Sequence, residues 1–379
     1  MGSYDVIVVG AGPAGVSAAK AAALGDARTL LLEKCPTIMA NKPCGEATSQ
    51  ATFKTAGVEP KPSIVLNKAY ARVYAPNMKF VEIRDVGFLI NKSLFIQEIA
   101  AQAAEAGADI HVREEAVSVW RNGDAMRIKT NRDEYSAKVI IGADGYNSTV
   151  ARSLGINERS EPIPTVQYVM VNCRLEYTDV VRFFLGNEIA PGGYAWIFPK
   201  SEKIAEVGIG VRAAPAKLYL DKFVKIFEKE LGSAKIIDYR GAPVPIGGMI
   251  KECVLDGVML VGDVAGTVIP LTGAGIHSSV AAGLMAGEVA ANACHEDDVS
   301  KERLSEFYEK YGPWINRINK SLKVMRALEK MTDEDLNLLQ SILDASDILD
   351  LANGLDVKRV ALKLLSHPIF AMKLAKALL

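Results

Sequence analysis

Short apolar runs alternate with alanine-rich stretches through the first third of the chain. The opening run Tyr4–Val9 stops at a glycine, which is typical of a strand buried on both faces of a parallel sheet. Ala14–Leu24 is alanine-rich and predicts a helix, and Thr29–Leu32 predicts the next strand. We expect these segments to form a strand–helix–strand unit with a right-handed crossover. The same alternation returns with a predicted helix at Leu94–Ala106 and a predicted strand at Asp109–Val112.

A different pattern occupies the middle of the chain. In residues 162–245, period-2 runs of apolar residues are separated by glycine, proline and charged turns, which predicts an antiparallel sheet. Two earlier runs, Ile64–Tyr74 and Lys79–Ile83, also have the character of strands. Residues 301–379 contain no convincing strand pattern, so we expect a helical region there.

These patterns predict an α/β protein, α+β overall. Its parts are a Rossmann-like domain with a parallel sheet, a second domain with an antiparallel substrate-binding sheet, and a helical C-terminal region. A length of 379 residues agrees with more than one domain. The expected division places residues 1–60, 86–158 and 254–300 in the first domain, residues 61–85 and 159–253 in the second, and residues 301–379 in the helical region.

The composition of the chain limits which classes of protein it can belong to. Lys and Arg total 44 against 45 Asp and Glu, so no overall basic field exists to attract nucleic acid. Five scattered cysteines without metal-ligand spacing favour a reducing cytosol, and we expect no metal site. We therefore expect a cytoplasmic protein, and we expect no transmembrane span because no apolar run is long enough to cross a bilayer. The tail Val357–Leu379 fits either peripheral contact with the inner face of the membrane or a helix that covers the core.

A glycine-rich turn gives the first indication of chemistry. Gly10, Gly12 and Gly15 form G-x-G-x-x-G between the first predicted strand and helix, where backbone N–H groups can approach a pyrophosphate. The N-terminus of the helix adds a favourable partial positive charge. Glu33 ends the next strand, where a carboxylate would accept hydrogen bonds from a ribose diol. This unit fits NAD as well as FAD.

Two later segments separate those cofactors. Gly142–Gly145 reads GADG and follows an apolar strand, and Gly262-Asp263 follows another. Asp263 would reach the ribityl hydroxyls of a flavin. The helix that begins near Gly275 would direct its N–H groups at the flavin ring and stabilise the negative charge of the reduced form.

In this order and spacing, the segments resemble the FAD-binding family that includes p-hydroxybenzoate hydroxylase, over roughly the first 300 residues. The resemblance implies FAD as the cofactor. Lys92 departs from the family pattern, because such proteins usually carry an arginine there. The residues that the resemblance assigns to FAD are Gly10, Gly12, Pro13, Ala14, Gly15, Glu33, Lys34, Cys44, Gly45, Lys92, Val117, Ala143, Asp144, Gly145, Gly262, Asp263, Pro270, Gly273, Gly275 and Ile276.

Two further segments narrow the choice within that superfamily. Lys42–Glu46 reads KPCGE, and Pro191–Pro199 reads PGGYAWIFP. Both resemble the geranylgeranyl reductase family, whose members share a Cys-Gly pair and a PxxYxWxFP sequence. The resemblance implies a prenylated lipid substrate of archaeal type, whose C=C bonds are saturated by flavin hydride transfer and protonation. It assigns catalysis to Cys44, Gly45, Tyr194 and Trp196, and substrate binding to Tyr194, Trp196 and Phe198.

Several alternatives stay open at this stage. Tyr194, Trp196 and Phe198 alternate along one strand and would line an apolar slot, or they form only sheet core. Cys44 donates a proton, tunes the flavin or fills space. The rival functions are a monooxygenase or halogenase, although Tyr194 replaces the first tryptophan of the halogenase WxWxIP motif, and an electron carrier or quinone reductase. The reductant is also open, since ferredoxin, NADPH and another hydride donor all fit.

Overall fold

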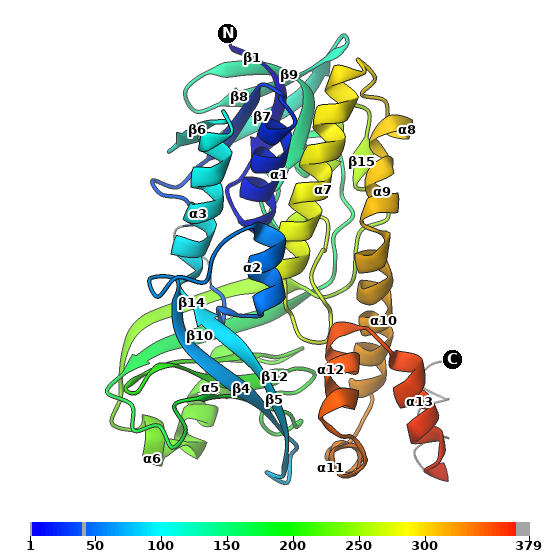
Figure 1. Cartoon of the computed structure of the whole chain (residues 1–379). Helices are drawn as coiled ribbons and strands as arrows, with labels where there is room; N and C mark the ends of the chain where they lie inside the picture. The colour runs from blue at the N-terminus through cyan, green and yellow to red at the C-terminus, as the bar shows by residue number, and fades with distance from the viewer. Residues whose placement is uncertain (1, 40–42, 369–379) are drawn as a thin grey trace.

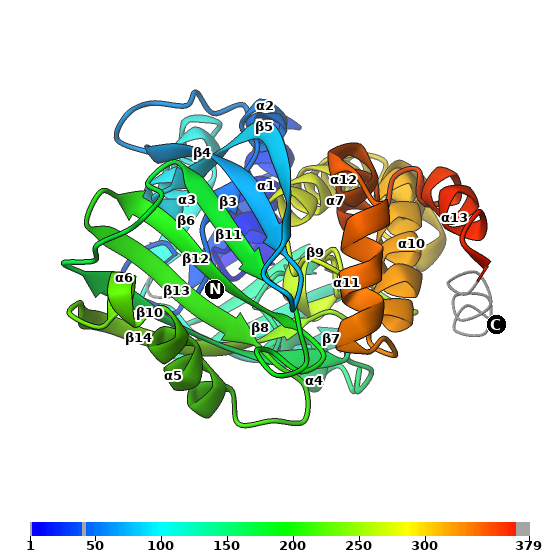
Figure 2. The ribbon, with the colours of Figure 1, turned by 90° about the horizontal axis from the view of Figure 1, so that it is seen from below.

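The computed structural model describes residues 2–39 and 43–368, so Lys42 and residues 369–379 of the predicted tail lie outside the described part. The molecule has two sheets at opposite ends of its long axis, joined by helices that run along one side (Figure 1). The C-terminal helices lie beside the second sheet and complete that end (Figure 2). The predicted fold class is therefore confirmed.

The first sheet has a parallel centre. Its strands follow the order β15-β16-β9-β1-β2-β6, and β1 pairs in parallel with both β2 and β9. The hairpin of β7 and β8 extends the sheet from β9 in antiparallel pairing. The bounds are β1 (Gly2–Val9), β2 (Thr29–Glu33), β6 (Asp109–Val112), β7 (Ala116–Asn122), β8 (Ala125–Thr130), β9 (Glu134–Gly142), β15 (Val254–Leu255) and β16 (Val258–Leu260).

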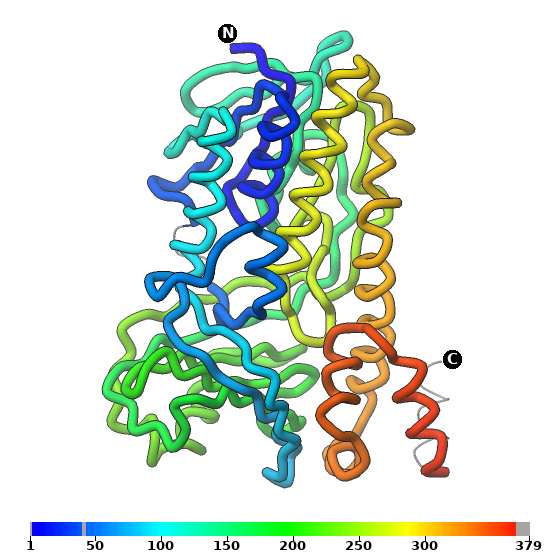
Figure 3. Tube along the Cα trace, viewed as in Figure 1, coloured from blue at the N-terminus to red at the C-terminus, as the bar shows by residue number. Residues whose placement is uncertain are grey.

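Three long helices lie against the first sheet (Figure 1): α1 (Pro13–Leu24), α3 (Lys92–Glu105) and α7 (Ile276–His295). Glycines let α7 lie close to α1, because a Cβ on Gly283 would meet the carbonyl oxygen of Ala14 at 2.0 Å. Both helices begin at the same end of the sheet, where its parallel strands end (Figure 3).

The second sheet follows the order β14-β10-β13-β12-β11-β4-β5-β3. Its neighbouring strands are antiparallel except β11 and β4, which run parallel. Two helices not predicted from the sequence, α5 (Ala216–Ile226) and α6 (Glu228–Leu231), interrupt the run of strands. The bounds are β3 (Ala47–Thr48), β4 (Val65–Tyr74), β5 (Phe80–Ile90), β10 (Pro162–Val171), β11 (Val180–Phe184), β12 (Tyr194–Ser201), β13 (Ile204–Gly210) and β14 (Lys235–Pro245).

Strand β5 runs past the predicted end at Ile83. The pairing with β4 shifts register so that Ala71 faces Ile83 whereas Ala69 faces Gly87, and the charged residues between them bulge out of the ladder. The bulge hides the continuation of the strand from the apolar pattern. The strand therefore crosses the division expected between residues 85 and 86, and β3 also lies in the second sheet.

The remaining short elements of the body are α2 (Gln50–Ala56), α4 (Thr149–Ser153) and the 3-10 turn η1 (Gly262–Val264). The C-terminal region is helical through residue 365, as predicted. Within residues 2–39 and 43–368, no helix combines the length and apolarity needed to cross a membrane. The helices are α8 (Lys301–Leu304), α9 (Glu306–Lys310), α10 (Gly312–Leu328), α11 (Asp333–Ile342), α12 (Ala345–Asn353) and α13 (Val357–Leu365).

Candidate active site

A cavity of about 570 Å³ lies between the two sheets and the C-terminal helices. Its wall combines the loops after the parallel strands, one face of the second sheet and side chains of α10. Most of the sequence-predicted site residues meet here. Those that line the cavity are Gly12, Pro13, Ala14, Cys44, Gly45, Lys92, Ala143, Gly145, Tyr194, Trp196, Phe198, Gly262, Asp263, Pro270, Gly273, Gly275 and Ile276.

The glycine-rich turn forms a tight backbone cradle at one end of the cavity. Gly10 has φ of 95°, a conformation that favours glycine, and a Cβ on Gly15 would meet the Gly10 carbonyl oxygen at 1.8 Å. Gly12 lies on the cavity wall with no atom within 4 Å of the place a Cβ would take. The turn is therefore tightly packed against its own backbone at Gly10 and Gly15, and it is open to the cavity at Gly12. This geometry fits a pyrophosphate held by backbone N–H groups at the start of α1.

Glu33 is tied to the same turn. Its Oε2 accepts a hydrogen bond from the Ala11 N–H at 2.9 Å, and its Oε1 accepts one from the Cys35 N–H at 2.8 Å. Two other residues that the resemblance assigns to the cofactor do not line the cavity. Lys34 is exposed after β2, and Val117 is 54% exposed on β7. The structure brings neither side chain to the cavity.

The GADG segment packs directly against the glycine turn. A Cβ on Gly10 would meet the Ala143 carbonyl oxygen at 2.6 Å. Asp144 Oδ2 accepts hydrogen bonds from the N–H groups of Thr149 and Val150, at 2.6 and 3.1 Å, and burial raises the pKa of Asp144. Asp144 thus shapes the loop that presents Gly145 to the cavity.

The N-terminus of α7 supplies the third backbone contribution. Gly262 and Gly273 have positive φ, 78° and 63°, and fold the connection between β16 and α7 along the cavity. No acidic side chain lies in the first turn of α7. Gly275 and Ile276 line the cavity where α7 begins, so the positive end of the helix dipole lies at this wall and would suit the negative charge of a reduced flavin ring.

His277 in the first turn of α7 adds no charge to this region. Burial lowers its pKa to about 4, with a smaller contribution from the charge of Arg317. Its Nε2 shares a hydrogen bond with Thr55 Oγ1 at 2.8 Å, and its ring contacts Trp314 edge-on at 4.8 Å between centroids. We assign His277 a packing role.

Aromatic side chains form the opposite wall. Tyr194, Trp196 and Phe198 lie on one face of β12, with ring centroids 5.9 and 6.0 Å apart, as their alternation predicted. Phe183 on β11 contacts two of these rings edge-on. Trp196 lies over Gly208, where a Cβ would meet its ring at 2.1 Å. The result is a continuous apolar surface facing the dinucleotide cradle.

The Cys44-Gly45 pair lies between the cradle and this wall. A Cβ on Gly45 would meet the Phe198 ring at 2.7 Å, so only glycine allows the segment to lie so close. Tyr194 is fixed by its hydroxyl, which donates a hydrogen bond to the Thr272 carbonyl. Burial raises the pKa of Tyr194, which keeps the phenol neutral.

Sequence reasoning missed the part of the wall that comes from the C-terminal helices and the polar part behind β12. Arg317 on α10 lies over the Trp314 ring at 4.2 Å and donates from Nε to the Asn353 carbonyl at 2.9 Å. No motif marks these residues. The additional lining residues of interest are Gln167, Phe183, Trp314, Arg317, Met325 and Leu328, together with Glu46 at the end of the KPCGE segment.

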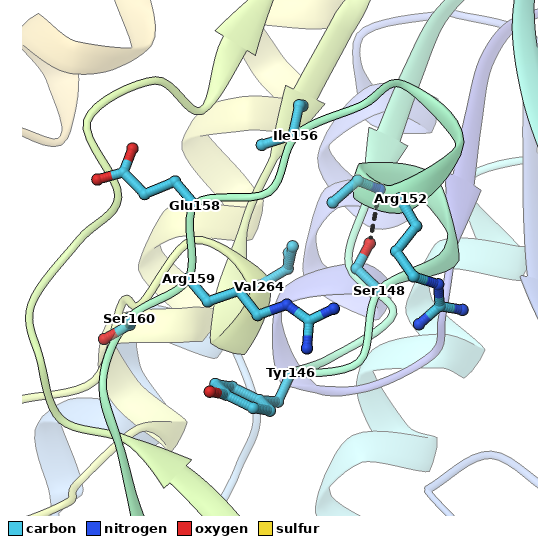
Figure 4. Close-up of a pocket in the computed structure, with 9 residues that line it drawn as sticks. Tyr146, Ser148, Arg152, Ile156, Glu158, Arg159, Ser160 and Val264 are labelled. Atoms are coloured by element: carbon cyan, nitrogen blue, oxygen red, sulfur yellow. Dashed lines mark hydrogen bonds between the residues drawn. The ribbon is translucent and has the colours of Figure 1, made fainter.

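A second, much smaller crevice lies behind the GADG segment (Figure 4). It encloses about 10 Å³, which holds no more than about one water. Ser148, which lines it, accepts a hydrogen bond from the Ala151 N–H and caps α4. The crevice is a gap in packing, and the large cavity is the candidate active site.

The fold and the cradle together define an FAD-dependent oxidoreductase, and the FAD dependent oxidoreductase family matches residues 5–157. The Geranylgeranyl reductase catalytic domain matches residues 162–244, which cover the aromatic wall. A digeranylgeranylglycerophospholipid reductase of Methanocaldococcus jannaschii is 34% identical over 99% of this chain and 98% of its own length. Its counterpart in Methanosarcina acetivorans is 37% identical over 90% of this chain and 88% of its own. The chain belongs to the geranylgeranyl reductase family.

Solved structures agree with this assignment. A geranylgeranyl bacteriochlorophyll reductase-like protein from Thermoplasma acidophilum has a TM-score of 0.89, with 29% identity over all of both chains. A flavin-dependent brominase has a TM-score of 0.74 with 16% identity, over 98% of this chain and 100% of its own. At that identity, the second likeness speaks for a common fold alone.

Proposed function

We propose that this protein is an FAD-dependent reductase that saturates the C=C double bonds of geranylgeranyl chains in archaeal-type glycerophospholipids. The single observation that carries the proposal is the cavity, in which a backbone cradle for a flavin dinucleotide faces a wall of aromatic rings. The relatives named as digeranylgeranylglycerophospholipid reductases match nearly the whole chain, which supports the same substrate class.

The cavity suits a long apolar chain. Beyond the aromatic wall it continues along Val268, Leu271, Met325 and Leu328, so apolar side chains follow one another from β12 to α10. An isoprenoid chain gains free energy from each methylene it buries, about 0.8 kcal/mol. An extended apolar path thus favours a prenyl chain over a compact aromatic substrate.

Saturating an isolated double bond requires one hydride and one proton, which together add two hydrogens across the bond. Reduced FAD, when bound, supplies the hydride. The substrate has no carbonyl to withdraw electrons, so positive charge develops at its tertiary carbon as the proton arrives. The rings of Tyr194 and Trp196 would stabilise that charge, and the mostly apolar lining of the cavity would disfavour the entry of water that could capture it.

Cys44 is our candidate for the proton donor. Cys44 lines the cavity, and its Sγ accepts a hydrogen bond from the Glu46 N–H at 3.3 Å. Tyr194 is less suited, because its hydroxyl proton is already given to the Thr272 carbonyl and its pKa is raised. In this scheme Cys44 Sγ gives a proton to the alkene carbon and is reprotonated from solvent before the next cycle.

We further propose peripheral contact with the inner face of the membrane, through the end of α13. Val360 and Leu364 are buried, and Arg359 and Lys363 form ion pairs with acidic residues of α12, so this part of the tail covers a core. Leu362 and Leu365 are 59% and 54% exposed on the same helix. The reductant of the flavin would be a ferredoxin, which delivers single electrons, or NADPH or another hydride donor.

Purified protein loaded with FAD, reduced chemically under anaerobic conditions and mixed with an unsaturated archaeal-type phospholipid tests the main proposal. Mass spectrometry should find products heavier by two hydrogens for each double bond reduced. An unchanged lipid would contradict the proposal. A hydroxylated or halogenated product that forms only when oxygen is admitted would favour a monooxygenase or halogenase instead.

Liposome flotation tests the membrane contact. Replacing Leu362 and Leu365 by Ser should weaken partitioning onto anionic vesicles about 30-fold or more, because two leucines at about 1–2 kcal/mol of apolar burial each contribute about 2–4 kcal/mol together. Leu24→Ser is the matched control, since Leu24 is 65% exposed at the end of α1. Equal flotation of the double variant and the wild type would contradict the contact.

A further inference from the structure

A group of buried polar side chains lies behind the Cys44–Glu46 segment. Gln167 on β10, Lys200 on β12 and Glu206 on β13 are 3%, 9% and 2% exposed. Burying polar and charged groups costs free energy unless they bond to one another or to something that needs them. Their partners therefore indicate what they do.

The partners lead to the Cys44 segment by two routes. Lys200 Nζ contacts the carboxylates of Glu46 at 2.6 Å and Glu206 at 2.9 Å. Gln167 Nε2 donates to Glu206 and also to the Cys44 carbonyl, the latter at 3.3 Å. One route thus reaches the side chain of Glu46, and the other reaches the backbone of Cys44.

Glu46 has an unusual backbone conformation that this group supports. Its φ is 56°, in the left-handed region that residues with a Cβ rarely adopt. In that conformation its N–H donates to Cys44 Sγ at 3.3 Å. Gly45 leaves the segment no room to relax toward the sheet, because a Cβ there would already meet Phe198 at 2.7 Å. The ion pair with Lys200 offsets the backbone strain at Glu46.

The charges within the group are balanced. Burial opposes a charge on Lys200, yet the carboxylates of Glu206 and Glu46 raise its pKa above the usual value and keep it protonated. Burial raises the pKa of Glu206, against the opposing effects of Lys200 and of Lys92 on α3. With both ammonium groups present, the two carboxylates are compensated. Without Lys200, Glu46 and Glu206 would lose the cation that they share next to the Cys44 segment.

We infer that Lys200, Glu206 and Gln167 are positioning residues, which hold the Cys44 thiol at the cavity wall and set its reactivity. The inference rests on the proposed function, in which Cys44 Sγ supplies the proton. Lys200 acts through Glu46 on the N–H that faces the sulfur. Gln167 acts through its hydrogen bond to the Cys44 carbonyl. Glu206 contacts both Lys200 and Gln167 and holds these two side chains in place.

The test is the rate at which iodoacetamide alkylates Cys44 in the FAD-loaded protein, followed across pH by peptide mass spectrometry. Lys200→Met should slow alkylation at neutral pH about tenfold and move the pH profile to higher pH, because uncompensated carboxylates disfavour the thiolate. Lys200→Arg should restore most of the rate, since it keeps the cation. An unchanged rate and profile in Lys200→Met would overturn the inference.

Arg182→Met is the matched control, because it breaks another buried ion pair in the same sheet. Arg182 contacts Glu230 at 2.7 and 2.8 Å and is 2% exposed. This variant should lower the melting temperature and leave Cys44 alkylation unchanged. If it slowed alkylation as much as Lys200→Met, the effect would be general loosening of the sheet, and the inference would fall.

A second pair of variants isolates the backbone of Glu46. Glu46→Gly adopts the left-handed conformation freely and keeps the N–H in place, whereas Glu46→Ala is strained there. Alkylation of Cys44 should stay within about threefold of wild type in the glycine variant and fall about tenfold in the alanine variant. Equal rates in the two variants would argue against positioning through the backbone. Neither readout needs the lipid, so failure of lipid reduction and failure of positioning are distinguishable.

Discussion

The two sheets contribute to one cavity in different ways. In the first sheet, backbone at the ends of parallel strands forms the cradle, and glycines such as Gly10, Gly12 and Gly15 make the approach possible. In the second sheet, side chains from the middle of β11 and β12 form the wall, with help from α10. The cofactor-binding half of the cavity therefore depends on positions that lack a side chain. The substrate-binding half depends on which side chains its strands carry.

This difference predicts that substitutions in the two halves of the cavity impair different steps. A substitution in the cradle should block the cofactor and with it every later step. A substitution in the wall should leave the cofactor bound and impair only the lipid reaction. Comparing the dissociation constant of FAD with kcat/KM for the lipid separates the two halves.

The largest effect is expected in the cradle. Gly15→Ala would place a Cβ 1.8 Å from the Gly10 carbonyl oxygen, so backbone must shift. Fluorescence titration of the apoprotein should find FAD affinity weakened about 100-fold, which is about 3 kcal/mol. Gly312→Ala is the control, because nothing lies within 4 Å of a Cβ there. FAD affinity within about threefold of wild type in Gly15→Ala would show that the turn does not hold the dinucleotide.

A smaller effect is expected at the wall. Trp196→Ala removes a ring that is 6% exposed and faces the cavity, so kcat/KM for lipid reduction should fall about 30-fold, or about 2 kcal/mol. FAD affinity should be unchanged. Trp120→Ala on β7, away from the cavity, should leave both quantities unchanged. Loss of FAD binding in Trp196→Ala would contradict the separation of the two halves.

The smallest effect concerns His277, at the junction of the two halves. Its pKa falls from 6.5 in the unfolded chain to about 4 in the fold, so the folded protein binds fewer protons than the unfolded chain between those values. The stability that His277 contributes is complete above pH 6.5 and is lost as the pH falls through about 4. Because the ring is partly exposed, we expect a contribution of about 1 kcal/mol.

Chemical denaturation at pH 7 and pH 4.5 measures this contribution. The wild type should lose about 1 kcal/mol more stability over this interval than His277→Gln. His295→Gln is the control, since His295 is more exposed at the other end of α7. Identical losses in wild type and His277→Gln would place the titrating group elsewhere.

The contrast between the cradle and the wall also explains which parts of the site could be predicted from the sequence. The cradle was predictable because each part is a short local motif between a strand and a helix, and the aromatic wall was predictable from alternation along β12. Glu206 was not, because the sequence EVGIGVR gives β13 an ordinary polar face. Only the fold reveals that Glu206 is buried and bonded to Lys200 and Gln167, which in turn contact the Cys44–Glu46 segment.

Long-range pairing explains the other omissions. The parallel pairing of β11 with β4 joins residues about a hundred positions apart, and no local pattern specifies it. The contribution of α10 to the cavity depends on how the C-terminal helices pack beside the second sheet (Figure 2). Val117 and Lys34, assigned to the cofactor by resemblance, are brought no closer to the cavity by the fold.

Anaerobic single-turnover oxidation of the reduced, FAD-loaded protein by the lipid tests the central claim most directly. With an unsaturated archaeal-type phospholipid as the sole oxidant, the flavin absorbance should return at the rate at which lipid gains two hydrogens per double bond. The fully saturated lipid should cause no return. Reduced flavin that persists beside the unsaturated lipid would contradict the claim that one cavity holds the cofactor against the chain it reduces.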